Sequence, residues 1–215
     1  MTAPRASRVP NGYSLGDGEA AVRIARAAVE AAVRGERFAL PPLTEIFRRN
    51  AGVFTTLNDF PSMQLRGCVG FAEPVETLAV ALVEASRAAA LEDGRFGPVG
   101  PDELARLVVE VSLLTPPREV EVARREAIPG AVEVGRHGLV VRRGRAGGLL
   151  LPQVAADWRW DAEEFLEQAC RKAGLPRDAW AQEGTRVLVF EADVFAEEAP
   201  RGAVARHGAG RASEG

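Results

Sequence analysis

The chain has 215 residues, of which 47% are hydrophobic and 27% charged, an ordinary composition for a globular protein. Its formal net charge of −3 argues against nucleic-acid binding over the whole surface, though not against one local basic patch. Two cysteines, Cys68 and Cys170, do not make a disulfide framework, and no apolar run approaches the ~20 residues of a membrane helix. With no signal-peptide pattern at the N-terminus, these features predict a cytoplasmic protein without a membrane partner.

Two helices are predicted in the first half of the chain. Ser14 and Asp17 have the spacing of a capping box at the start of the first helix, and Gly35 is suited to end it. The second helix is predicted to begin at Pro74, with Val75 on its buried face.

Strand patterns occupy the rest of the ordered chain. The predicted strands cover residues 53–57, 63–71, 107–115, 132–134, 138–142, 148–151 and 185–195. Asp161 is suited to cap the third helix, and Cys170 lies on the apolar stripe of that helix as a core residue. Two antiparallel hairpins and the absence of βαβ regularity predict an α+β fold, with a mostly antiparallel sheet and flanking helices.

The most unusual segment runs from Leu65 to Phe71. Alternation in a strand places Arg66 and Cys68 on one face, where a cation favours the thiolate, so the two are candidate catalytic residues. Gly67 and Gly70 weaken a strand, which indicates a bulge or the close approach of a ligand or of another backbone. Arg66, Gly67 and Gly70 are therefore candidate ligand contacts. The alternative is a buried structural cysteine beside an arginine that pairs with a carboxylate such as Glu110 or Glu73.

The histidines offer little for catalysis. His137 is a candidate ligand contact and, like Glu110, a candidate base for Cys68, but a turn histidine bonded to the backbone is the favoured interpretation. His207 falls in the predicted C-terminal tail, so no multi-histidine metal site is expected. No P-loop or dinucleotide-binding glycine pattern occurs, and we predict neither a metal nor a cofactor.

Four arginines lie between Arg136 and Arg145 with no acidic residue among them. They are suited to contact phosphates, and equally to keep a hairpin tip solvated. The tip is favoured because the interleaved aromatic residues of a single-strand reader are missing. Nucleic-acid binding here is therefore a weaker alternative.

The segment Leu65–Gly70 resembles the LRGC[IV]G signature of the AMMECR-one domain family. Further blocks resemble the same family in the same order: Gly52–Leu57, Asp93–Phe96, Val109–Ser112, Gly148–Ala155 and Lys172–Leu175. The resemblance covers residues 14–197, which we take as one domain, and composition predicts flexible tails at 1–13 and 198–215. Gly94, where proline is expected, and Val69, where isoleucine is commoner, are small departures from the family pattern.

The resemblance implies two unequal subdomains with a cleft between them, the larger built from both chain ends and the smaller from an inner segment. It also implies a Memo-like protein and a radical SAM protein as partners, since similar proteins are called AmmeMemoRadiSam system protein A. No reaction follows from the resemblance, so whether the protein is an enzyme stays open. One hypothesis is a binding or accessory module that recognises a partner protein or small ligand. The other is a thiol-dependent enzyme in which Arg66 activates Cys68.

Overall fold

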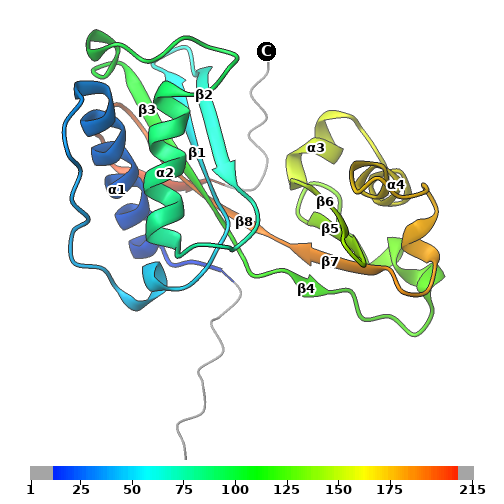
Figure 1. Cartoon of the computed structure of the whole chain (residues 1–215). Coiled ribbons are helices and arrows are strands. Elements are labelled where there is room, and N and C mark those ends of the chain that lie inside the picture. The colour runs from blue at the N-terminus through cyan, green and yellow to red at the C-terminus, as the bar shows by residue number, and fades with distance from the viewer. Residues whose placement is uncertain (1–11, 208–215) are drawn as a thin grey trace, which may run out of the picture.

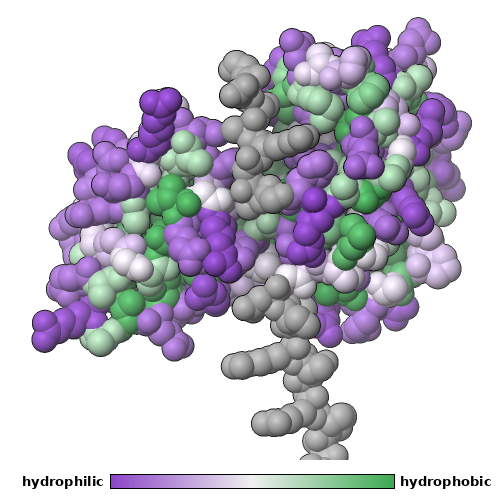
Figure 2. Space-filling model, turned by 180° about the vertical axis from the view of Figure 1, so that it is seen from behind, coloured by the Kyte–Doolittle hydropathy of each residue, from purple (hydrophilic) through white to green (hydrophobic). Residues whose placement is uncertain are grey.

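Residues 12–207 are described by a computed structural model, and they form two lobes of unequal size that lie side by side (Figure 1). The larger lobe holds a five-stranded sheet, and the smaller lobe holds a four-stranded one. The chain crosses to the smaller lobe after β3 and returns from β7 into β8. Seen from behind, both lobes show hydrophobic residues among hydrophilic ones at the surface (Figure 2).

The elements confirm the predicted α+β class. The helices are α1 (Leu15–Arg34), α2 (Leu78–Leu91), α3 (Pro152–Asp157) and α4 (Ala162–Lys172). The strands are β1 (Val53–Asp59), β2 (Gln64–Phe71), β3 (Leu107–Leu114), β4 (Arg118–Glu119), β5 (Gly138–Arg143), β6 (Ala146–Leu150), β7 (Arg186–Phe190), β8 (Ala192–Glu197) and β9 (Val204–His207). The larger sheet has the order β2-β1-β3-β8-β9 and the smaller β4-β7-β5-β6, with antiparallel neighbours throughout.

Local sequence signals set the ends of α1. The Ser14 hydroxyl accepts a hydrogen bond from the Asp17 backbone N–H, and the Asp17 carboxylate accepts one from the Ser14 backbone N–H in return. At the other end Gly35 adopts a left-handed conformation with φ 68°, and its N–H bonds to carbonyls of the last turn. The predicted boundaries of this helix are thus confirmed.

The start of α2 differs from the prediction. The helix begins at Leu78, with Thr77 in an extended conformation before it, so Pro74 belongs to the connection from β2. Val75 is 71% exposed and is not a core residue. The predicted strand at residues 132–134 is also wrong. A turn forms there because the Glu133 carbonyl accepts from the backbone N–H groups of Arg136 and His137.

The predicted final strand is divided between the two lobes. β7 belongs to the smaller sheet and β8 to the larger, and Glu191 lies between them. Glu191 and Thr115, which stand at the two crossings between the lobes, are tied together. The Thr115 N–H donates to the Glu191 carbonyl and the Glu191 N–H donates to Thr115 Oγ1, each at 2.8 Å.

The predicted C-terminal tail is wrong over part of its length. Val204–His207 forms β9, which extends the larger sheet beside β8. Arg206 fixes this strand: its guanidinium lies 5.1 Å from the centre of the Phe195 ring and 3.3 Å from Asp193 Oδ1. Near the other end, Tyr13 is buried and its hydroxyl donates to the Leu114 carbonyl at 3.0 Å. Residues 1–11 and 208–215 lie outside the described part of the chain.

Three apolar clusters hold the fold together. One lies between α1, α2 and the larger sheet. A second fills the smaller lobe and includes Cys170, which is fully buried as predicted. The third joins the lobes through Leu114, Val140 and Phe190, with Phe54 packed against them. Between residues 12 and 207, no helix has both the length and the apolar composition needed to cross a membrane.

Candidate functional site

The two glycines of the β2 motif are explained by close packing. A Cβ on Gly67 would lie 2.2 Å from the Ala89 carbonyl oxygen of α2, so only glycine lets the helix backbone approach the strand. A Cβ on Gly70 would lie 2.4 Å from the Phe54 ring. The space beside both residues is filled by the protein itself. The alternative of a close backbone approach therefore holds for Gly67, while the interpretation of Gly67 and Gly70 as ligand contacts stays a prediction.

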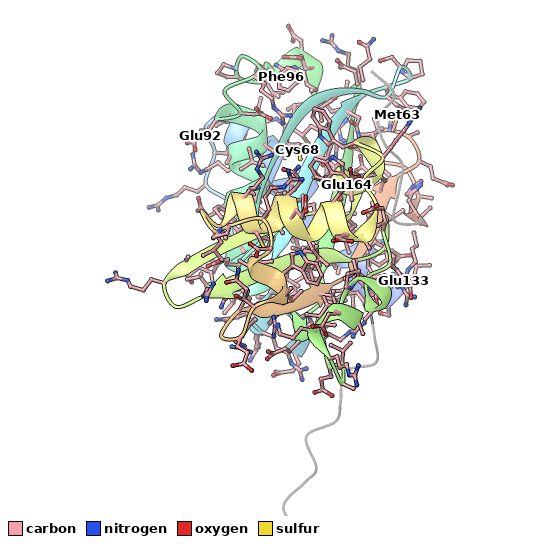
Figure 3. The ribbon with its side chains drawn as sticks, turned by 90° about the vertical axis from the view of Figure 1, so that its right-hand side faces the viewer. Met63, Cys68, Glu92, Phe96, Glu133 and Glu164 are labelled. Carbon is pink, nitrogen blue, oxygen red and sulfur yellow. The ribbon has the colours of Figure 1, made fainter. Side chains whose placement is uncertain are left out.

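Cys68 lies on the face of the larger sheet opposite α2. Because α2 covers the Gly67 face, alternation turns the Cys68 side chain to the other face. Thr56 stands opposite Cys68 on β1, and Glu110 stands opposite Thr56 on β3, so the three form one row across the sheet. Figure 3, which looks from the side of the smaller lobe, shows Cys68 on the larger lobe above α4.

The surroundings of Cys68 favour the neutral thiol. The Thr56 hydroxyl donates to Cys68 Sγ at 3.3 Å, and the Cys68 backbone N–H donates to Asp93 Oδ2 at 2.8 Å. Burial raises the pKa of the Cys68 thiol above its ordinary value, and this outweighs the opposing effects of the Thr56 hydrogen bond and of the Arg95 charge. Such a thiol is a poor nucleophile at neutral pH.

The guanidinium beside Cys68 belongs to Arg95, in the loop that follows α2. Its Nη2 lies 2.7 Å from Asp93 Oδ2 and donates to the Cys68 carbonyl at 3.3 Å. The Arg95 hydrogen bonds hold the pKa of the Asp93 carboxyl far below its usual range. Sequence reasoning missed this role. The block Asp93–Phe96 had matched the family pattern, but no spacing rule links it to Cys68, about 25 residues away along the chain.

Arg66 does not share the surroundings of Cys68, because a bulge interrupts the alternation of β2. Leu65 pairs with Asn58 and Gly67 pairs with Leu57, which leaves Arg66 without an opposite residue. Its guanidinium binds both carboxylate oxygens of Glu103: Nε donates to Oε2 at 2.8 Å and Nη2 donates to Oε1 at 3.0 Å. This geometry therefore does not support the activation of Cys68 by Arg66.

The alternative of an internal carboxylate partner for Arg66 holds, but with a different acid from the two expected. The same guanidinium also donates to the carbonyls of Gly97 and Pro98, at 2.9 and 3.2 Å. Of the two acids that sequence reasoning had offered, Glu73 lies 3.5 Å from Arg142 of the smaller lobe, and Glu110 lies in the Cys68 row.

His137 is separate from Cys68. Its Nδ1 accepts from the Glu133 backbone N–H at 3.0 Å, and its Nε2 lies 3.4 Å from Arg118 Nη2. In Figure 3 Glu133 lies well below Cys68, across α4. The structure thus places His137 in a turn of the smaller lobe and does not form the Cys68–His137 dyad. No group of three or more His, Cys, Asp or Glu side chains that could hold a metal ion was found within residues 12–207.

Most of the arginines between residues 136 and 145 have internal partners. Arg136 pairs with Glu133 and Glu191, Arg142 with Glu73, and Arg143 with Gln182. Arg145, at the hairpin tip, is exposed. This part of the chain therefore presents less free positive charge than its sequence suggests.

An apolar groove begins where the β2 motif ends. Its cavity has a volume of about 390 Å³ and is lined by Gly70, Phe71, Ala72, Glu73, Val75, Glu76, Val80, Ala81 and Glu84. Phe71, Val75 and Val80 are 43%, 71% and 42% exposed, so three large hydrophobic side chains gather at one opening. We call this feature the β2–α2 groove. Sequence reasoning missed it because Val75 was expected in the core.

Comparisons with known proteins found similar sequences and a similar solved structure. A protein of Thermococcus gammatolerans is 50% identical over 195 residues, which cover 88% of this chain and 94% of the relative. A Methanocaldococcus jannaschii protein is 44% identical, over 89% of this chain and 95% of the relative. The crystal structure of an uncharacterised Pyrococcus horikoshii protein superimposes with a TM-score of 0.72 at 45% identity, covering 88% and 96% of the two chains. The family model AMMECR1 matches residues 22–195, and the chain belongs to this family.

Proposed function

We propose that this protein is a cytoplasmic binding or accessory module that docks a segment of a partner protein in the β2–α2 groove. The exposure of Phe71, Val75 and Val80 around one cavity carries the proposal. Contiguous exposed apolar surface with a polar rim is typical of interaction sites, whereas single exposed apolar residues are ordinary.

The chemistry of the rim indicates what kind of segment fits. Glu73, Glu76 and Glu84 line the same cavity, and all three are exposed. Arg142 and Arg87 lie within 3.5 and 3.3 Å of Glu73 and Glu84. An apolar floor whose rim carries both acidic and basic side chains suits an amphipathic segment with apolar anchors and charged flanks. The partners we propose are the Memo-like protein and the radical SAM protein that the resemblance implies.

The geometry supports a thiol-dependent enzyme less well. Burial keeps Cys68 protonated, Arg66 is bound to Glu103, and His137 lies elsewhere. None of the three expected contributions to thiol chemistry comes together at Cys68. The motif strand instead serves to position the groove, since Gly70 and Phe71 line it.

The test uses recombinant Memo-like and radical SAM proteins from the same genome as this chain. Titration calorimetry measures the affinity of the wild type and of Val80→Glu, which places a charge in the groove. Val134→Glu is the matched control, because Val134 is similarly exposed, at 38%, but lies in the smaller lobe. We expect binding of at least one partner, an affinity loss of about tenfold or more in Val80→Glu, and none in the control. Absence of binding, or equal affinity in both variants, contradicts the proposal.

A further inference from the structure

A second cavity lies between the two lobes, apart from the β2–α2 groove. Its volume is about 390 Å³. Tyr13, Arg49 and Asn50 line it from the larger lobe, Arg118 lines it from β4 of the smaller lobe, and Thr115 and Glu191 line it at the crossings. A molecule bound here would contact both lobes at the place where the chain passes from one to the other.

Two arginines give this cavity its character. Arg49 and Arg118 both line it and both are exposed, and within residues 12–207 neither forms an ion pair with a carboxylate. The Arg118 guanidinium contacts His137, with 3.4 Å between Nη2 and Nε2. Many other arginines of this chain are paired with acids, such as Arg26, Arg66 and Arg136. Two guanidinium groups that keep their donors available therefore stand out at one cavity.

The other polar groups of the cavity do not cancel this charge. Glu191 is the acid that lines it, and the Arg136 guanidinium lies 3.2 Å from Glu191 Oε2. The Thr115 hydroxyl oxygen accepts from the Glu191 N–H, which leaves the hydroxyl proton free to donate into the cavity. The cavity therefore offers two arginines without a carboxylate partner in the described part of the chain, one carboxylate that Arg136 neutralises and one hydroxyl donor, on surfaces that come from both lobes.

From this arrangement we propose that the inter-lobe cavity binds a small anionic molecule whose carboxylate or phosphate oxygens bridge Arg49 and Arg118. Guanidinium groups bind both kinds of oxyanion through paired, charge-assisted hydrogen bonds. Because one arginine comes from each lobe, the ligand joins the lobes and stabilises their arrangement. The site is independent of the β2–α2 groove and makes no use of Cys68.

The test is calorimetric titration of the full chain with inorganic phosphate, pyrophosphate and succinate, against sodium chloride at matched ionic strength. The variants are Arg49→Gln and Arg118→Gln. Arg145→Gln is the control, because it removes the same charge from the exposed hairpin tip. We expect saturable binding of at least one oxyanion, weakened about tenfold or more by each cavity variant and unchanged in the control. Comparison of the phosphate and succinate arms decides which oxyanion class the site takes.

His137 supplies a second readout. Its ring is buried behind Arg118, with Glu133, Arg136 and Glu191 as the other charged groups around it. Burial is the main cause that lowers the His137 pKa, and the Arg118 charge lowers it further. An anion on Arg118 offsets this second contribution, so NMR titration of the ring should show an upward shift of the His137 pKa on binding. No saturable binding, binding that all three variants share equally, or binding without any His137 shift each overturns the proposal. Val80→Glu should bind the anion with wild-type affinity. The test of the anion site is therefore independent of the test of partner binding in the β2–α2 groove.

Discussion

Arg66 and Glu103 form a two-bonded ion pair that joins β2 to the turn before β3. Both side chains are largely buried, with exposures of 15% and 19%, and Glu103 also accepts from the Gly100 N–H at 2.8 Å. The Arg66 guanidinium also donates to the Gly97 and Pro98 carbonyls, so it holds the middle of the loop between α2 and β3. The arginine of the family signature thus binds three residues of this loop.

Arg66→Ala is expected to cost about 3 kcal/mol of the free energy of unfolding, because it removes both bonds to the largely buried Glu103 and leaves that carboxylate with the more exposed Arg106, 3.4 Å away. For a chain of this length that corresponds to a fall in Tm of roughly 6–12 °C. Arg66→Lys should recover only part of the loss, because lysine lacks the planar fork. Thermal melts measure both, with Arg145→Ala as an exposed control. If Arg66→Ala has the same Tm as the wild type, Arg66 has no structural role.

The same pair predicts how stability depends on pH. The hydrogen bonds from Arg66, with further contributions from the Gly100 N–H and from Arg106, lower the pKa of Glu103 from 4.5 to about 2. A carboxyl whose pKa is depressed in the folded state stabilises the fold above its unfolded pKa, and this contribution disappears as the pH falls toward the folded pKa. Urea unfolding should therefore show that the wild type loses more stability than Glu103→Gln between neutral pH and pH ~3. Parallel curves for the two proteins would contradict the coupling.

Gly67→Ala tests the approach of α2 to the motif strand. The added Cβ would lie 2.2 Å from the Ala89 carbonyl oxygen, a backbone atom that moves only with the helix. We expect a loss of about 3 kcal/mol, as in other overpacked sites. Gly130→Ala is the control, because nothing lies within 4 Å of its added Cβ. Chemical denaturation that shows equal stability in the two variants would rule out this packing argument.

Local signals in the sequence predicted the fold where neighbouring residues alone determine the backbone. The Ser14 capping box and the Asp161 cap are of this kind, and both helices start where expected. The bulge at Arg66 was not predicted from local signals. A prediction of which face a strand residue occupies assumes regular alternation, and the bulge interrupts it. β9 was missed for a related reason: it is a strand because β8 offers it an edge to pair with.

The candidate site was predictable only in part. The motif itself was visible in the sequence, and Cys68 was placed correctly on the face opposite Gly67. The partners of Cys68 and Arg66 were not visible, since Arg95 and Glu103 reach them through the loop after α2. Such contacts depend on tertiary packing, and no periodicity records them. The β2–α2 groove was not visible either. The helix was predicted to begin at Pro74 but begins at Leu78, and the residues before it, such as Val75, line the groove.

Cys68 should be slow to react with alkylating agents. Because burial raises its pKa, the rate of carboxymethylation should stay low until the pH exceeds the ordinary thiol value of ~8.5. Mass spectrometry of digested peptides separates Cys68 from Cys170, which is fully buried and should react only after unfolding. Thr56→Val, which removes the hydrogen bond to Sγ, should shift the profile to still higher pH. Rapid modification of Cys68 at neutral pH would contradict this prediction and support the hypothesis of a thiol-dependent enzyme.

We expect β9 to stabilise the larger sheet. A chain that ends at Glu197 loses the pairing of β8 with β9, and with it the Arg206 contacts to Phe195 and Asp193. Compared with a chain that ends at His207, it should lose about 2 kcal/mol, since the cation–π contact to Phe195 and the charge-assisted hydrogen bond that Arg206 donates to the Tyr13 carbonyl each contribute about 1 kcal/mol. The expected fall in Tm is roughly 4–8 °C. Arg206→Ala in the longer chain removes the Arg206 contacts but keeps the backbone pairing of β9, so it measures the contribution of the side chain alone. The hydrogen bond from the Tyr13 N–H to Asp193, at 2.7 Å, remains in that variant. Equal melting of the two truncated chains would mean that β9 adds nothing to the stability of the larger sheet.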